Sequence, residues 1–198
     1  MDTLVHKAKQ HDKEAFSQLM RLHTTAMYKV AKAILKNDDD AADAIQETAL
    51  TCWEKINTLK KDKYFKTWMT RILINHCNTI YQQRTRMLSC ESVPETGQTP
   101  SEYEAIEWQE FLQCLDEKYR IVTILYYVEG FKIREIAEIL QLNENTVSTR
   151  LVAAREKMEK QYRQKKANIK RIVWKKGVFV MSYFEDIMDN LKQNEEVP

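Results

Sequence analysis

Apolar residues recur at steps of three and four along most of the chain, which is the spacing of one face of an α-helix. Between Asp12 and Lys36 this face comprises Ala15, Phe16, Leu19, Leu22, Ala26, Val30, Ile34 and Leu35. Asp12 directly precedes the run, and an aspartate there can accept hydrogen bonds from the free backbone N–H groups that start a helix. The pattern therefore predicts an amphipathic helix from about residue 12 to about residue 36.

Two further apolar stripes predict two more helices. The first, at about residues 40–59, carries Ala42, Ile45, Ala49, Trp53, Ile56 and Leu59, and the second follows the basic loop "KKDK" and carries Phe65, Trp68, Met69, Ile72, Leu73 and Ile80. The carboxylates of "NDDD" at residues 37–40 suit the start of the first of these helices, because the helix dipole favours negative charge there. Three long helices with apolar stripes predict a compact bundle.

The periodicity stops after the third helix. The segment "RMLSCESVPETGQTP", from residue 86, holds two of the three prolines and one of the three glycines, which is typical of a linker. The apolar period resumes at Tyr103. The sequence thus predicts an all-α protein with two helical domains at residues 1–85 and 103–162, an acidic linker at 86–102 and a C-terminal extension at 163–198.

The second domain contains two amphipathic helices separated by a few residues. Their apolar faces comprise Ile133, Ile136, Ala137 and Leu140 in the first helix, and Val147, Leu151, Ala154 and Met158 in the second. So short a connection predicts a steep crossing, the geometry of a helix-turn-helix whose second helix can enter a DNA major groove. Asn143 is the expected N-cap of that helix. A helical hairpin with a solvated polar face is the alternative.

Composition and charge support this interpretation. The chain has 198 residues, of which 3 are Gly and 3 are Pro, and this scarcity favours helices. The net charge of +2 hides a segregation: residues 91–117 hold eight carboxylates and no Lys or Arg, whereas residues 160–176 hold eight Lys or Arg and no carboxylate. Residues 143–166 contain seven Lys or Arg and three Glu. This local excess would attract the second helix to DNA whatever its sequence.

Both halves of the chain resemble one known family, the extracytoplasmic-function, or group IV, sigma factors of bacterial RNA polymerase. The resemblance covers about residues 12–161. "LDEKYRIVTILYYVEGFKIREIAEILQLNENTVSTRLVAAREKM" is similar to sigma domain 4, which binds the minus-35 promoter element, and "DDAADAIQETALTCWEKI" followed by "YFKTWMTRILINHC" is similar to sigma domain 2, which grips the polymerase core and melts the minus-10 element. The resemblance implies a transcription initiation factor that is not an enzyme and needs no cofactor.

The resemblance also implies roles for individual residues. The face formed by Asp43, Gln46 and Glu47 would dock on core RNA polymerase. The implied minus-10 contacts are Lys61, Lys63, Tyr64, Trp68, Arg71, Asn75 and Arg84, with further phosphate attraction from Lys60 and Lys66. The implied minus-35 contacts are Asn145, Thr146, Ser148, Thr149, Arg150 and Arg155. Phe65 and Trp68 also fit the core stripe, so burial competes with base stacking for each of them, and Tyr64 is the better exposed candidate.

The chain departs from the family pattern at several positions. Gln141 occupies the turn of domain 4 where the family usually has glycine, so the turn must tolerate strain or adopt another shape. Ser148 and Ala153 replace the usual basic residues of the recognition helix. These differences leave the helix register intact and put the promoter sequence in doubt.

The extension places an apolar block, "VFVMSYF", after its basic half. This block predicts either a contact with a sigma domain or a partner, or a locally packed helix.

The remaining features concern location, partners and rival functions. Because no apolar run approaches the roughly 20 residues of a membrane span, we expect a cytoplasmic protein without direct membrane insertion. The family resemblance implies core RNA polymerase, promoter DNA and an anti-sigma factor as its partners. The four cysteines are irregularly spaced and no liganding His pair occurs, so no metal site is predicted. The main alternative is a stand-alone helix-turn-helix regulator; a helical enzyme and a structural scaffold are others.

Overall fold

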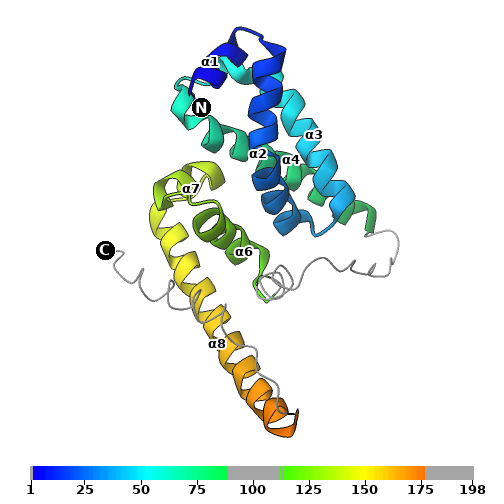
Figure 1. Ribbon diagram of the computed structural model, residues 1–198, viewed down its shortest axis with the longest axis vertical. Helices are drawn as coiled ribbons and strands as arrows, with labels where there is room; N and C mark the ends of the chain where they lie inside the picture. The colour runs from blue at the N-terminus through cyan, green and yellow to red at the C-terminus, as the bar shows by residue number, and fades with distance from the viewer. Residues whose placement is uncertain (1, 89–111, 113, 177–198) are drawn as a thin grey trace. The chain divides into compact units, whose positions relative to one another are not determined.

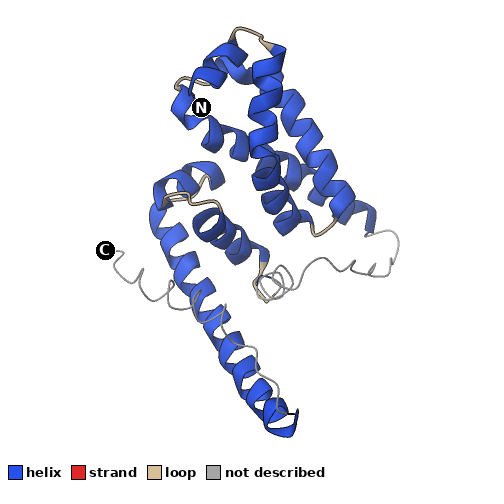
Figure 2. Cartoon of the chain, viewed as in Figure 1, coloured by secondary structure: helices blue, strands red, loops and turns tan. Residues whose placement is uncertain are grey.

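Helices make up both predicted domains. The computed structural model describes residues 2–88, 112 and 114–176, and this part of the chain contains helices, turns and loops without a strand (Figure 2). The elements are α1 (Asp2–Lys9), α2 (Lys13–Leu35), α3 (Asp38–Lys55), η1 (Ile56–Thr58), η2 (Asp62–Tyr64), α4 (Phe65–Leu88), α6 (Glu117–Thr123), η3 (Ile124–Val128), α7 (Ile133–Leu140) and α8 (Glu144–Lys176). The predicted all-α class is confirmed.

Helices α1 to α4 form the N-terminal bundle, in which α2, α3 and α4 pack on one another (Figure 1). The predicted cap of α2 is present, and α3 has a cap that was not predicted. The Asp12 carboxylate accepts hydrogen bonds from the backbone N–H groups of Glu14 and Ala15 at 3.0 and 3.1 Å. The Asn37 side chain accepts one from the N–H of Asp40 at 3.0 Å, so the "NDDD" run starts α3 as expected. These caps satisfy donors that would otherwise lack partners.

The core of the bundle follows the predicted stripes only in part, and α2 and α3 depart from them. On α3 the predicted core residue Ala42 is exposed, and the buried face runs instead through Ala41, Ala44, Thr48 and Cys52. Leu22, expected in the core, is exposed, whereas His23 and Met27 are buried. At about 100° per residue the centre of the buried face of α2 runs through His23, and Leu22 lies about a quarter turn or more from it. The predicted apolar stripe of α2 is therefore rotated away from the buried face, because the residue at the centre of that face is a histidine.

Helix α1 was not predicted. It buries Val5 and Ala8, and its Lys9 ammonium contacts the basic loop between α3 and α4. Lys9 Nζ donates to the carbonyl of Leu59 at 2.7 Å and pairs with the Asp62 carboxylate at 2.5 Å. The loop before α4 is thereby fixed to the bundle.

The C-terminal helices α6, η3, α7 and the start of α8 surround a second group of buried residues. These include Val122, Leu125, Ile136, Ile139, Val147, Leu151, Ala154 and Met158. η3 is one turn of π-helix, and Gly130 follows it with φ +69°, a left-handed conformation that glycine adopts at no steric cost.

Residues 1–158 form one compact unit, and residues 159–198 are a second unit. Within the first unit α2 contacts α6 and α4 contacts α7, so the two predicted helical domains pack directly on each other. Helix α4 continues to Leu88, which makes residues 86–88 of the predicted linker helical. The rest of the linker and the apolar block of the extension lie outside the described residues, while the basic half of the extension is helical as far as Lys176.

Candidate docking face and nucleic-acid interface

The outer face of α3 is polar and accessible. Asp43, Gln46 and Glu47 are all exposed, and Ala41, Ala44, Thr48 and Cys52 are buried on the opposite face. Leu50, at the next helical step after Gln46 and Glu47, is 59% exposed. Leu50 was not predicted to belong to this face, although its spacing of three residues from Glu47 places it there. The three predicted residues therefore share one surface with an exposed apolar side chain beside them.

The loop between α3 and α4 presents basic and aromatic side chains together. Lys61 and Lys63 are exposed, and Tyr64 is 43% exposed with the Lys63 ammonium 5.0 Å from its ring centroid. Phe65 is buried in the core, and the half-buried Trp68 lies 5.9 Å from it, centroid to centroid. The expectation that Tyr64 is the accessible aromatic and Phe65 a core residue is confirmed.

Helix α4 continues this surface with Arg71 and Asn75, which are exposed and follow Trp68 at steps of three and four. Arg84 does not share their face, because nine residues from Asn75 turn the helix by about half a revolution. Its guanidinium instead forms an ion pair with Asp40 of α3. The structure thus brings together Tyr64, Trp68, Arg71 and Asn75 and separates Arg84 from them.

The helix-turn-helix has a left-handed turn residue. Gln141 has φ 55° and ψ 43°, and its N–H donates to the carbonyl of Ala137 as α7 ends. Left-handed backbone costs a non-glycine residue about 1–2 kcal/mol, so the turn keeps the shape for which glycine is usual and tolerates the strain. The Asn143 side chain then accepts a hydrogen bond from Thr146 N–H at 2.6 Å, which confirms it as the N-cap of α8.

The first turns of α8 carry a stripe that faces away from the core. Asn145, Thr149 and Val152 are exposed at steps of four and three, and Val152 is 51% exposed. Thr146 and Ser148 flank this stripe and are half-buried. The spacing of the sequence places Val152 on the same exposed face as Ser148 and Thr149, and its exposure agrees with that expectation.

The two predicted arginines of α8 are both partly buried in the fold. The Arg155 guanidinium donates from Nη2 to the Tyr127 hydroxyl at 3.2 Å, and its Nε is buried without a partner in the described part of the chain. Arg150 is half-buried and lines a pocket with Asn75 and Asn78 of α4. Neither arginine therefore extends freely from the recognition face in this conformation.

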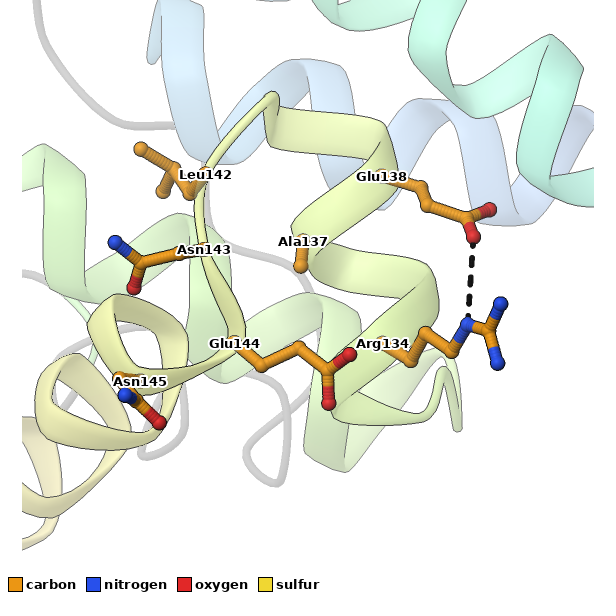
Figure 3. A pocket seen from close by; sticks show the side chains of 7 residues that line it. All are labelled: Arg134, Ala137, Glu138, Leu142, Asn143, Glu144 and Asn145. Atoms are coloured by element: carbon orange, nitrogen blue, oxygen red, sulfur yellow. Dashed lines mark ion pairs between the residues drawn. The ribbon is translucent and has the colours of Figure 1, made fainter.

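A shallow pocket lies between α7 and the start of α8 (Figure 3). Its lining residues are Arg134, Ala137, Glu138, Leu142, Asn143, Glu144 and Asn145. Arg134 pairs loosely with Glu138, Nε to Oε1 3.6 Å, and its side chain remains largely exposed. Arg134 is a second basic residue beside the recognition helix that the sequence analysis did not name.

Burial shifts the pKa values of two cysteines and one histidine in the bundle. Desolvation raises the pKa of the Cys52 and Cys77 thiols to about 12 in each case, so both are protonated at neutral pH. Desolvation is also the largest cause that lowers the pKa of His23, with the nearby Lys66 charge adding to it. Among the described residues no three His, Cys, Asp or Glu side chains gather as metal ligands, and no described helix is long and apolar enough to span a membrane.

Comparisons with known proteins place these surfaces in a family. A model of Sigma-70 region 2 matches residues 19–87, and a model of Sigma-70 region 4 matches residues 105–158. The chain is 30% identical over 151 residues to RNA polymerase sigma factor SigV of Bacillus subtilis, covering 75% of this chain and 91% of SigV. It is 26% identical over 181 residues to the ECF RNA polymerase sigma factor SigW of the same organism, covering 80% of this chain and 95% of SigW. The chain belongs to the extracytoplasmic-function (ECF) group of sigma-70 RNA polymerase sigma factors.

Solved structures share the fold of this sigma factor. Sigma factor RpoE of Bartonella quintana, solved with the anti-sigma factor NepR, matches with a TM-score of 0.66 at 23% identity, over 75% of this chain and 96% of RpoE. CnrH, solved with the cytosolic domain of CnrY, matches with a TM-score of 0.64 at 22% identity, over 82% of this chain and 97% of CnrH. The match to region 2 contains the α3 face and the Tyr64 surface, and the match to region 4 contains the helix-turn-helix.

Proposed function

We propose that this ECF sigma factor binds core RNA polymerase and directs promoter-specific initiation through three surfaces of its own. The observation that carries the proposal is that one chain holds an exposed carboxylate and amide face in region 2 and an exposed recognition stripe in region 4. A stand-alone helix-turn-helix regulator needs the second feature and leaves the first without a role. The polymerase performs the chemistry, so no residue of the chain is assigned as catalytic, and the protein acts in the cytoplasm.

The core-docking face consists of Asp43, Gln46 and Glu47 on α3. In the described part of the chain none of the three makes an intramolecular hydrogen bond or ion pair that would have to break on docking. They can therefore pair with basic groups of a partner at little reorganisation. Loss of one partner of a desolvated charge pair at an interface costs about 2–5 kcal/mol. Leu50 lies beside them and supplies an apolar contact.

The minus-10 surface consists of Lys61, Lys63, Tyr64, Trp68, Arg71 and Asn75. Tyr64 offers an exposed ring to an unstacked base, and stacking of this kind contributes about 1–3 kcal/mol per base. The two lysines and Arg71 supply the phosphate attraction that single-stranded DNA requires. Arg84 reaches this DNA after releasing Asp40, which makes its contribution smaller.

The minus-35 surface consists of Asn145, Thr146, Ser148, Thr149, Arg150 and Arg155, to which we add Val152. Asn145 and Thr149 present amide and hydroxyl groups to base edges, and Val152 presents methyl groups that suit the C5-methyl of thymine. Arg150 and Arg155 hold phosphates and so set the position of the helix without reading sequence.

An anti-sigma factor is the remaining partner. RpoE and CnrH, which share this fold, were solved as complexes with NepR and with the cytosolic domain of CnrY. By analogy we propose that a protein of this class binds the present chain and blocks its access to core polymerase.

Capture of bacterial core RNA polymerase by the purified chain tests the proposal. We compare the wild type with a variant carrying Asp43→Ala, Gln46→Ala and Glu47→Ala. A control variant carries Glu14→Ala, Ser17→Ala and Gln18→Ala, which are exposed polar positions on α2. The wild type and the control should bind core and support transcription from a promoter, and the α3 variant should lose at least tenfold in core affinity. Failure of the wild type to bind core at moderate salt would favour the stand-alone regulator.

A further inference from the structure

The loop between α3 and α4 carries one carboxylate among several lysines. Residues 60–63 read "KKDK", so Asp62 lies between Lys61 and Lys63, which the proposed function assigns to promoter DNA. A carboxylate at this place repels phosphates, and it can also pair with the neighbouring lysines and so withhold them from DNA. The loop therefore attracts DNA best when a residue from elsewhere in the chain neutralises Asp62.

Lys9 of α1 supplies that neutralising charge. Its Nζ lies 2.5 Å from Asp62 Oδ1, and the two side chains are only 20% and 24% exposed. Among the described residues Asp62 forms its salt bridge with Lys9 and not with Lys61 or Lys63. A pair that is partly shielded from water is screened less by salt than an exposed one. Lys61 and Lys63 meanwhile remain exposed.

The same ammonium also fixes the backbone of the loop. Lys9 Nζ donates to the carbonyl of Leu59 at 2.7 Å. Leu59 follows the last residue of η1, and Asp62 begins η2, so one ammonium bridges the two turns across the two residues between them. A loop that is ordered before its ligand arrives loses less conformational entropy on binding. Lys9 therefore orders the loop as well as balancing its charge.

The turn after α1 adds a second contact with the same region. His11 has left-handed backbone with φ 62°, and its ring packs edge-on against Trp53 with the centroids 5.4 Å apart. His11 Nε2 also lies 3.4 Å from Asn57 Nδ2 in η1. Val5 and Ala8, both fully buried, attach α1 to the bundle. We call the contacts of Lys9 and His11 with residues 53–62 the α1 clasp.

The clasp lies next to the exposed aromatic residue of the minus-10 surface. η2 is a single 3₁₀ turn from Asp62 to Tyr64, and the N–H of Phe65 donates to the Asp62 carbonyl. Phe65 is 1% exposed, so the turn ends in the core, while Lys9 holds its beginning. Tyr64 lies between these two anchors and is 43% exposed. The direction of its ring therefore depends on both of them.

We propose that Lys9 is a positioning residue for promoter opening. By pairing with Asp62 and holding the Leu59 carbonyl, it keeps the loop in the conformation that presents Tyr64 to an unstacked base. It also leaves Lys61 and Lys63 to the phosphates. Lys9 acts on the opening rate through the loop and not through a DNA contact of its own. This inference rests on the minus-10 contacts assigned under the proposed function.

Hydrogen exchange followed by mass spectrometry tests the clasp in the free protein. Lys9→Ala removes both contacts of the ammonium, and Lys7→Ala is the matched control because Lys7 is an exposed lysine of the same helix. Peptides covering residues 57–64 should exchange at least fivefold faster in Lys9→Ala than in Lys7→Ala, while peptides from the middle of α3 exchange equally. Equal exchange of residues 57–64 in the two variants would overturn the proposal.

The rate of promoter opening tests the positioning role in the holoenzyme. A fluorescent base analogue in the minus-10 element reports opening at saturating core polymerase. Lys9→Ala should open the promoter at least fivefold more slowly than Lys7→Ala, and Lys9→Arg, which keeps the charge and the donors, should stay within twofold of the wild type. All these variants should capture core equally. Identical opening rates for Lys9→Ala and Lys7→Ala would refute the positioning role.

A double-mutant cycle with Tyr64 separates positioning from a general loss of stability. Tyr64→Ala slows opening by some factor in the wild-type background. That factor should be at least threefold smaller in the Lys9→Ala background, because the ring is no longer well presented there. Independent effects on the rate would multiply, so an unchanged factor for Tyr64→Ala would show that Lys9 does not act through this ring, and the proposal would be wrong.

These outcomes distinguish the inference from the proposed function. If the wild type initiates transcription while Lys9→Ala opens promoters as fast as Lys7→Ala, the inference is wrong and the sigma function stands. If the wild type fails to capture core polymerase, the proposed function fails and the inference falls with it, whatever the exchange rates of the loop.

Discussion

Substitution by glycine should stabilise the protein at the strained turn of the helix-turn-helix and destabilise it inside a helix. Gln141 adopts φ 55° and ψ 43° with an exposed side chain. Gln141→Gly removes a left-handed penalty of about 1–2 kcal/mol and adds about 0.5–1 kcal/mol of unfolded-state entropy. The net expectation is a gain of about 1 kcal/mol in the free energy of unfolding. Gln18→Gly, in the exposed interior of α2, should instead lose about 1 kcal/mol because glycine there only weakens the helix.

Urea denaturation followed by circular dichroism measures both changes. With a slope of about 2 kcal/mol per molar urea, the midpoint should rise by roughly 0.5 M for Gln141→Gly and fall by a similar amount for Gln18→Gly, with slopes unchanged. Gln141→Asn should lie between wild type and glycine, because asparagine tolerates the left-handed region better than glutamine. A fall in the midpoint for Gln141→Gly as large as that for Gln18→Gly would refute the assignment of strain to this residue.

Three further predictions concern the DNA surfaces and the buried histidine. Tyr64→Ala should slow promoter opening, measured with a fluorescent base analogue in the minus-10 element, while Tyr64→Phe retains the wild-type rate because the ring is kept; equal rates for Ala and Phe would argue against stacking. Replacing thymine by deoxyuridine in the minus-35 element should weaken DNA binding by the wild-type holoenzyme and leave DNA binding by the Val152→Ala holoenzyme unchanged. An identical loss of affinity in both proteins would contradict the methyl contact. The pKa of His23 is lowered in the folded state. Below pH 6.5 this histidine therefore binds a proton in the unfolded chain but not yet in the folded chain. The free energy of unfolding should consequently fall as the pH drops from 6.5 towards the folded pKa. His23→Leu should flatten that dependence in denaturation curves at several pH values, and an unchanged slope would place its origin elsewhere.

Local sequence patterns accounted for the helices and their ends. Asp12 and Asn143 were recognisable as N-caps because an N-cap needs a short polar side chain and only its next three residues. The order of the two domains and the exposed α3 face also followed from local spacing. The face of α2 was misplaced because His23 is polar, and it packs against Phe65, which lies some forty residues away in the sequence.

The sequence by itself therefore determined the all-α class, the helix-turn-helix and the family, since each depends on residues within a few turns of one another. The tertiary structure decided which of the candidate DNA contacts are available together. Arg84 is turned onto Asp40, Arg155 onto Tyr127, and Lys66 onto Glu129. The periodicity of each helix tells which side chains share a face, but the partner of a long charged side chain depends on which other helix packs beside it, and that is settled by the packing of the whole unit.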